Sequence, residues 1–333
     1  MRSHARLFER IATPENLWAA HDEARKGKRR RGDVAAFGLA AEVELASLVD
    51  QLATGRWHPL GHRLHVLRDP KPRLIAAAPF RDRVVHHGIH RVIAPILTRR
   101  FLPESFACLP GRGTHRAVLA FQDGLRKHRF IARLDVQRYF LEIRWDVVLR
   151  IVRRTIRDER LLGLLETVLR SSAGLYDDPE LLAELGLIDR YRPESRKGLA
   201  IGSLTSQLFA NLVLDGLDHF AKRELKVPKL VRYMDDIVLF GDRRGLLGEQ
   251  AGACSEWLSK ERSLVVHPGG GHPASTRQTF RFLGHVVSRM ERRVGARTLR
   301  RLMGKLKAAT RDGELSAEAI EQRVASALGA VRF

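Results

Sequence analysis

The chain has 333 residues, of which 44% are hydrophobic, and it carries a formal charge of +21 at pH 7. This length and apolar content exclude a disordered tail and suffice for two or three packed subdomains, whereas so large an excess of Arg and Lys indicates a polyanionic partner, nucleic acid before anionic membrane. No apolar run approaches the roughly 18–20 residues of a membrane span, and the first residues lack the apolar core of a signal peptide. We therefore expect a cytoplasmic protein that has no membrane partner.

Helices dominate the expected secondary structure. Apolar residues recur three and four positions apart in seven segments, two of which begin beside the capping residues Thr13 and Asp33. In chain order these segments are 14–27, 33–54, 81–97, 139–157, 159–172, 204–224 and 245–262. Between the first two, the basic run RKGKRRR at 25–31 is either a solvated arm or a grip on phosphates.

Strands are expected where short apolar runs lie between turn residues. They are 63–67, 73–77, 130–135, 230–232, 236–240, 263–266 and 280–287. The first two form a hairpin around the turn Asp69-Pro70-Lys71-Pro72. From residue 130 onward the order is strand, helix, strand, strand, helix, strand. That order predicts a split βαβ, ferredoxin-like sheet in an α+β fold.

The segment 292–311 combines basic residues with leucines at helical spacing. The leucines are Leu299, Leu302 and Leu306, and the first basic residues are Arg292, Arg293, Arg297, Arg300 and Arg301. This pattern predicts a helix with one apolar stripe and one basic face, suited to lie along a nucleic-acid backbone. An ordinary surface helix is the alternative.

Three aspartates form the candidate chemical centre. Asp235 and Asp236 stand between two apolar strand segments, where adjacent carboxylates fit best at a tight turn, and Asp135 ends the strand FIARLD. A ferredoxin-like strand order places Asp135 beside that turn. Carboxylates that converge repel one another unless a cation bridges them, and such hard oxygen ligands favour Mg²⁺. The alternative is an ordinary Asp-Asp turn.

Four blocks of the sequence resemble reverse transcriptases. YMDD at 233–236 is the sequence of their palm hairpin, FIARLDVQRYF at 130–140 resembles the palm strand that supplies their other aspartate, and FRFLGHVV at 280–287 is similar to their primer grip. Residues 73–118 resemble the fingers of bacterial enzymes of the retron and group II intron kind. The resemblance covers nearly the whole chain and implies a right-hand polymerase fold. Its N-terminal helices and fingers would span 1–130, its palm 131–290 with a fingers insertion at about 158–200, and its short basic helical thumb 291–333.

One block narrows the resemblance. Where most reverse transcriptases have QGxxxSP, this chain reads IGSLTSQ from Ile201 to Gln207, which resembles the enzymes of diversity-generating retroelements. That likeness implies an RNA-directed DNA polymerase that makes cDNA from a template RNA with frequent errors, for mutagenic retrohoming. It also implies dNTP substrates, a small basic accessory protein as partner, and a bacterial, phage or archaeal host.

The resemblance also implies roles for individual residues. Asp135 and Asp235 would bind two Mg²⁺ ions, or Mn²⁺ in their place, with Asp236 nearby and the Val136 carbonyl as a further ligand. Phe140 matches the aromatic gate that selects deoxynucleotides. The other residues assigned to the nucleotide and the templating pair are Lys71, Arg73, Ile201, Gly202 and Gln207. The chain departs from its relatives at Gly270, where they commonly carry a Lys.

Two alternatives to the retroelement enzyme remain. One is a related reverse transcriptase of an antiviral defence system or a retron. The other is a catalytically inactive RNA-binding scaffold, which the basic charge and the missing Lys at position 270 favour and the three intact aspartates oppose.

Overall fold

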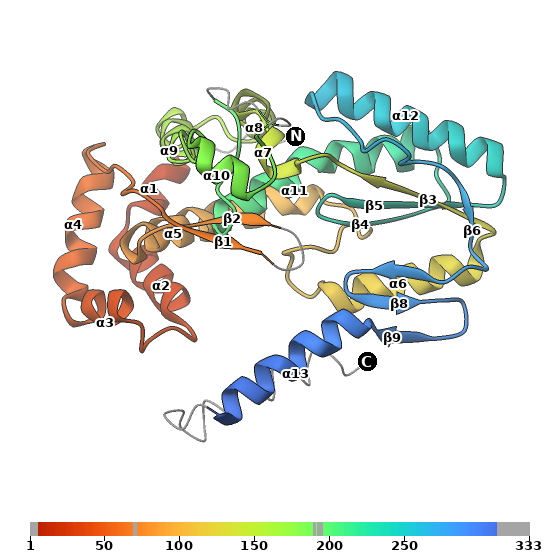
Figure 1. Cartoon of the computed structure of the whole chain (residues 1–333). Coiled ribbons are helices and arrows are strands. Elements are labelled where there is room, and N and C mark those ends of the chain that lie inside the picture. Colours follow the sequence, from red (N-terminus) through yellow and green to blue (C-terminus); the bar gives the residue numbers. More distant parts are fainter. Residues whose placement is uncertain (1–5, 69–71, 189–190, 192–195, 312–333) are drawn as a thin grey trace. The chain divides into compact units, whose positions relative to one another are not determined.

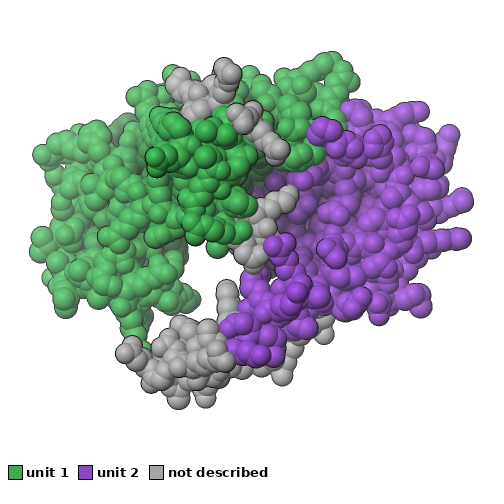
Figure 2. Space-filling view, viewed as in Figure 1, with its two compact units in different colours: residues 1–103, 136–219, 255–267 green, residues 104–135, 220–254, 268–333 purple. Residues whose placement is uncertain are grey.

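The computed structural model describes residues 6–68, 72–188, 191 and 196–311, and Figure 1 labels its helices and strands. The described chain forms two compact units, each built from three separate segments (Figure 2). Unit 1 comprises residues 1–103, 136–219 and 255–267, and unit 2 comprises residues 104–135, 220–254 and 268–333. Within the described ranges, every helix is too short or too polar to cross a lipid bilayer. The boundaries of fingers, palm and thumb stay predictions.

The N-terminal part of unit 1 is helical, as expected. Its helices are α1 (Leu7–Ile11), α2 (Pro14–Arg25), α3 (Gly32–Leu39), α4 (Ala41–Ala53) and α5 (Phe80–Leu97). Thr13 caps α2, because its hydroxyl accepts a hydrogen bond from the Asn16 amide at 3.2 Å. Helix α2 packs on α5 at Gly88, where an added Cβ would lie 3.0 Å from Leu17. The single helix expected over 33–54 is wrong, since Ala40 (φ −115°, ψ 23°) leaves the helical conformation between α3 and α4.

The rest of unit 1 consists of one hairpin and further helices. These elements are β1 (Arg63–Leu67), β2 (Arg73–Ala77), the 3₁₀ turn η1 (Thr98–Arg100), α7 (Tyr139–Glu142), α8 (Trp145–Arg153), α9 (Glu159–Arg170), α10 (Pro179–Glu184) and α11 (Leu204–His219). The predicted hairpin is confirmed, whereas its tip, with Lys71, lies outside the described residues. Leu74 and Ala76 of β2 are buried in a core with Leu141, Tyr176 and Leu182. The helix expected over 139–157 is two helices, α7 and α8.

Unit 2 contains the expected palm sheet. Its described strands are β3 (Phe130–Asp135), β4 (Lys229–Tyr233), β5 (Asp236–Gly241) and β6 (Ala274–Ser275). They form an antiparallel sheet in the order β4-β5-β3-β6, with β3 and β5 at its centre (Figure 1). The first strand in the chain thus lies between the third and the fourth, as a split βαβ arrangement requires. The α+β class and the ferredoxin-like palm of a right-hand polymerase are confirmed.

Helix α6 (Thr114–Lys127), which the sequence pattern did not predict, packs on this sheet. Its Phe121 stacks on Phe282 with ring centroids 4.4 Å apart and contacts Phe240 of β5 edge to face. Gly124, one turn farther along α6, lies directly against the Phe240 ring. Helix α6 therefore fixes the position of β5, the strand that begins with Asp236.

Two strands expected in the last third of the chain differ from those in the structure. Residues 263–266 form no strand, because Ser263 has φ +56° at the end of α12 (Arg244–Arg262) and Val266 makes only an isolated bridge to Val136. The strand expected over 280–287 is a hairpin of β7 (Phe280–Phe282) and β8 (His285–Val287), which turns at Gly284 (φ +81°).

The basic helix begins later than expected. Residues 292–294 form the strand β9 (Arg292–Val294), which pairs with β8, and α13 (Ala296–Arg311) starts only after Gly295. The Gly295 amide donates to the Gly284 carbonyl at 2.9 Å, and this tertiary bond favours a sheet over a helix at this point. Arg292 and Arg293 are therefore strand residues.

Candidate active site

The Asp-Asp pair lies on a two-residue hairpin between β4 and β5. Tyr233 pairs with Asp236 across the hairpin, so Met234 and Asp235 form the turn. Such short loops require a positive φ at the first turn residue because their twist must match that of the strands. Met234 has φ +52°, a conformation that costs free energy for a residue with a side chain. The predicted tight turn is confirmed, and it is strained.

Asp135 lies directly opposite Asp236 in the sheet. The two aspartates are Cα partners in the antiparallel register of β3 and β5, which places their Cβ atoms about 4.5–5.5 Å apart. Like charges in such positions destabilise a sheet unless something compensates them. Arg133 Nη2 lies 3.7 Å from Asp236 Oδ1, but both side chains are about 40% exposed, so water screens this ion pair. Asp235 lies at the adjacent turn, so all three aspartates lie at the edge of the sheet where β3 ends and β5 begins.

The donor chemistry of this edge fits a divalent cation. Three carboxylates supply hard oxygen ligands, which Mg²⁺ prefers. Among the described residues, no three His, Cys, Asp or Glu side chains lie together as a metal-binding cluster. Val136 directly follows β3 and is buried. Its bridge to Val266 includes a hydrogen bond from Gln137 N to Val265 O at 2.8 Å, and this bond does not use the Val136 carbonyl.

Arg232 supports the turn from inside the sheet. Its side chain is fully buried, and its Nη1 donates to the Met234 carbonyl at 3.4 Å. Its own amide donates to Glu104 O at 2.8 Å, and its carbonyl accepts from the Phe106 amide at 2.9 Å. A buried guanidinium destabilises a fold unless its donors find partners, so its place beneath the turn indicates a positioning role. We did not predict this role, although an Arg within the apolar strand KLVRY is the signal for it.

The residues predicted to contact the nucleotide lie in unit 1. The loop 199–202 joins them, because Leu199 N donates to Phe140 O at 2.8 Å and Ala76 N donates to Ile201 O at 2.9 Å. Gly202 (φ +115°) lies so close to β2 that an added Cβ would be 3.3 Å from Ile75 and 3.4 Å from the Ala76 carbonyl. Unit 1 thus brings the loop beside β2, the strand that begins with the exposed Arg73, and beside the half-buried Phe140.

Gln207 occupies the first turn of α11. Its side chain is half-buried, and its amide donates to Ser203 O at 3.3 Å. It lines the same hollow of unit 1 as Gly202. The structure therefore places Gly202 and Gln207 at one hollow of unit 1, and their contact with the templating pair stays a prediction.

The predicted nucleic-acid-binding arginines differ in their surroundings. Arg293 on β9 and Arg297, Arg300 and Arg301 on α13 are exposed. Arg292 is half-buried, and its Nη1 donates to Gln122 Oε1 of α6 at 2.7 Å. Its guanidinium therefore ties β9 to α6.

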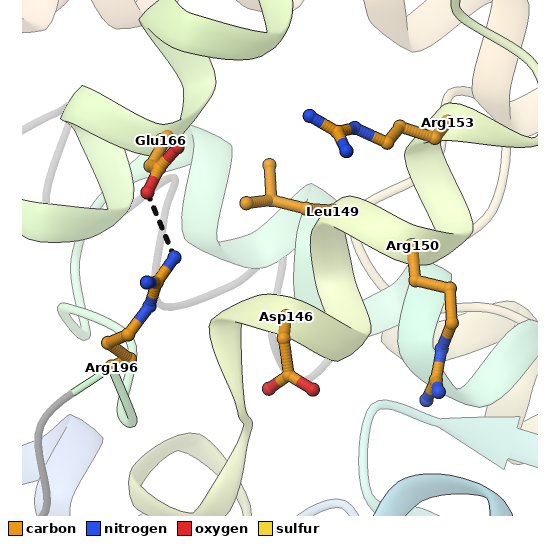
Figure 3. A pocket seen from close by; sticks show the side chains of 6 residues that line it. All are labelled: Asp146, Leu149, Arg150, Arg153, Glu166 and Arg196. Carbon is orange, nitrogen blue, oxygen red and sulfur yellow. Dashed lines mark hydrogen bonds and ion pairs between the residues drawn. The ribbon is translucent and has the colours of Figure 1, made fainter.

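A second hollow of unit 1 lies between α8 and α9 (Figure 3). Its arginines include Arg196 and Arg153, which form ion pairs with Glu166 at 2.9 Å and with Glu159 at 3.6 Å. Glu166 also pairs with Arg170 of its own helix at 2.9 Å. Because acidic side chains compensate much of its positive charge, we assign this hollow no function.

The chain is similar in sequence to named proteins and in structure to a solved complex. The chain is 29% identical to the protein YkfC of Escherichia coli over 185 residues, which are 54% of this chain and 45% of that protein. It is 28% identical to the mitochondrial nuclear intron maturase 1 of Arabidopsis thaliana over 93 residues, which are 28% and 13% of the two chains. The chain thus spans less than half the length of these relatives. Among solved structures, it resembles a partial Cas6-RT-Cas1–Cas2 complex with a TM-score of 0.42 and 19% identity, over 78% of this chain and 42% of that chain.

The family pattern of the reverse transcriptase (RNA-dependent DNA polymerase) matches residues 68–287. This match covers the hairpin β1–β2 in part, the loop before α11 and all three aspartates. The chain belongs to the reverse transcriptase family.

Proposed function

We propose that this protein is an RNA-directed DNA polymerase that makes cDNA from a template RNA. The observation that carries the proposal is the register of the palm sheet, which sets Asp135 opposite Asp236 and beside the Asp235 turn in a member of the reverse transcriptase family. The charge of +21 supports a nucleic-acid substrate.

The proposed reaction joins the primer 3′-oxygen to the α-phosphorus of a dNTP and releases pyrophosphate. Asp135 and Asp235 would hold two Mg²⁺ ions, or Mn²⁺ in their place, assisted by Asp236 and the Val136 carbonyl. When bound, these ions would lower the pKa of the 3′-hydroxyl and neutralise charge on the leaving pyrophosphate. Arg73, exposed at the start of β2, would offset the charge of the triphosphate, and Lys71 is assigned the same role by sequence.

Phe140 would select deoxynucleotides by excluding a ribose 2′-hydroxyl. We expect Phe140→Ala to raise incorporation of rNTPs relative to dNTPs by at least about tenfold, because removing a side chain from a substrate pocket relaxes discrimination by this order. The Phe140 carbonyl, which binds Leu199 N, remains in the variant, so the loop is retained. Competing rNTP and dNTP incorporation on one template measures the ratio. Phe140→Tyr keeps the ring and should leave the ratio unchanged, and an unchanged ratio in Phe140→Ala would remove the gate from this account.

We further propose that the enzyme serves a diversity-generating retroelement and copies with frequent errors. Ile201 and Gln207 supply the sequence support. The loop from His267 to Gly271, which carries Gly270 in place of a Lys, is bound to β3, since Gly271 N donates to Arg133 O at 2.7 Å two residues before Asp135. The absence of a Lys side chain at position 270 is in keeping with low accuracy of copying. A small basic accessory protein would complete the assembly.

Primer extension on an RNA template with Mg²⁺, followed by sequencing of the cDNA, tests both levels of this proposal. We expect full-length cDNA with errors concentrated at template adenines. Accurate cDNA would refute the retroelement role and favour a defence or retron enzyme. Absence of any cDNA, with and without candidate accessory proteins, would favour the inactive scaffold.

A further inference from the structure

A hollow of about 190 Å³ in unit 1 collects positive charge that the proposed catalytic chemistry does not use. Lys28, from the basic run at 25–31, and Arg83 and His87, from α5, line it together with Gly202 and Gln207. No carboxylate is among the described residues that line it. The hollow therefore joins part of the N-terminal basic run to the motif loop before α11.

The cations in this hollow are close enough to disfavour one another's charge. Burial, then the charges of Arg83 and Arg31, lower the pKa of Lys28. Burial is the main cause that lowers the pKa of His87, which lies 3.5 Å from Glu23, so this ring is neutral near pH 7 and the positive charge of the hollow comes from Lys28 and Arg83. Arg83 has an acidic partner in Asp33 at 2.7 Å, whereas Lys28 forms no ion pair with any described residue. An anion placed in the hollow would relieve this repulsion.

The wall behind these cations is already ordered. His86 is buried, and its Nδ1 lies 2.8 Å from Thr205 Oγ1 and 3.3 Å from Ser203 Oγ. Burial lowers the pKa of His86 to about 3, so the ring is neutral and binds the two hydroxyls as a hydrogen-bonding group. It fixes the start of α11 against α5, and with it Gly202 and Gln207. A preformed wall reduces the ordering cost of binding a ligand.

We propose that this hollow binds a backbone phosphate of the single-stranded RNA template next to the templating nucleotide. The inference rests on the proposed polymerase function, because the same hollow contains Gly202 and Gln207. A metal-bound triphosphate does not suit it, since no described lining residue could hold the metal. Lys28 and Arg83 supply charged donors for phosphate oxygens, and Lys26, Arg29 and Arg30 of the same run are exposed. Within the run, Arg25 is half-buried at the end of α2 and pairs with Asp22 at 2.7 Å, so the run is a solvated arm except at Arg25 and Lys28.

The test compares Lys28→Gln with the matched control Lys26→Gln, since both remove one Lys from the same run. Their affinity is measured by fluorescence anisotropy for two probes, an RNA–DNA duplex with a single-stranded RNA template overhang and the same duplex with a blunt end. We expect Lys28→Gln to bind the overhang probe about tenfold more weakly than wild type, the usual order for a charge-assisted hydrogen bond. Its plot of log affinity against log salt should be shallower by about 0.7. Lys26→Gln should lose much less affinity for the overhang probe. On the blunt probe, the two variants should bind with equal affinity.

A neutral methylphosphonate at successive overhang positions locates the contact. One position should weaken wild type by the same factor and leave Lys28→Gln unaffected. Equal binding of the overhang probe by the two Lys variants would overturn the inference, as would an equal loss for overhang and blunt probes. The proposed function fails separately, if wild type binds the overhang probe and still makes no cDNA. Melting temperatures equal to that of wild type would show that both variants are folded.

Discussion

Replacing Asp135 by asparagine should abolish primer extension and at the same time make the metal-free protein slightly more stable. Asparagine keeps the shape of the side chain but removes the negative charge opposite Asp236. Loss of a metal ligand removes several kcal/mol of transition-state stabilisation, so we expect a decrease in rate of about 10³-fold or more. Relief of repulsion between opposed charges should raise the free energy of unfolding by about 0.5 kcal/mol. A residue with a purely structural role would not produce this opposite pair of effects.

Urea unfolding in EDTA and in Mg²⁺ measures the second effect. Wild type should gain stability with Mg²⁺, because an ion that binds only the folded state stabilises it, and Asp135→Asn should gain less. Asp50→Asn is a suitable control, since Asp50 forms an exposed surface ion pair with Arg56 at 2.5 Å. If Asp135→Asn is less stable than wild type in EDTA and responds equally to Mg²⁺, the aspartates do not form a cation site.

Gly124→Ala should destabilise unit 2 by about 2 kcal/mol, because overpacking a close-packed core costs about 1–3 kcal/mol. The added Cβ would lie 2.6 Å from two atoms of the Phe240 ring, which is fully buried. Helix α6 or β5 must therefore move. Helix α6 also contacts the β4–β5 hairpin, since Thr114 Oγ1 donates to the Tyr233 hydroxyl at 3.2 Å, so we expect the proposed polymerase activity to fall together with stability.

Chemical denaturation of Gly124→Ala and of Gly163→Ala provides the comparison. Gly163 is in helix α9 with no atom within 4 Å of an added Cβ, so the same substitution should stabilise the protein by up to about 1 kcal/mol there. Phe240→Leu should be less harmful in the Gly124→Ala background than in wild type, because a smaller side chain leaves room for the methyl group. Equal stability of the two Ala variants would show that α6 does not press against β5.

The sequence predicted the strands that lie between clear turn residues with accuracy, whereas the long helices expected over 33–54 and 139–157 are each divided in two. The hairpin at 63–67 and 73–77 and the strand at 130–135 have the expected bounds, because their apolar runs lie between clear turn residues. The two-residue strand β6 and the start of β9 were not predictable, since tertiary hydrogen bonds such as Gly295 N to Gly284 O create them. Helix α6 was missed because it begins after Gly113 (φ +126°) with no side-chain cap.

The candidate site was predictable to the extent that strand register determines it. Asp135 and the Asp235-Asp236 turn could be placed together, because a ferredoxin-like strand order makes β3 and β5 neighbours. Arg232 and Lys28 could not be separated from the many other basic residues, since their importance comes from burial beneath a turn and from a hollow formed by distant segments. The hydrogen bond from Arg292, which we predicted to bind nucleic acid, to Gln122 of α6 was likewise not predictable, because it joins residues 170 positions apart.

Template-directed extension of a DNA primer on RNA tests the central claim most directly, with wild type, Asp235→Asn and the control Asp50→Asn compared in Mg²⁺. We predict that wild type and Asp50→Asn produce cDNA complementary to the template, and that Asp235→Asn produces none while it still binds the primer–template duplex. Extension by Asp235→Asn at the wild-type rate would contradict the account, because the palm carboxylates would then have no part in the reaction.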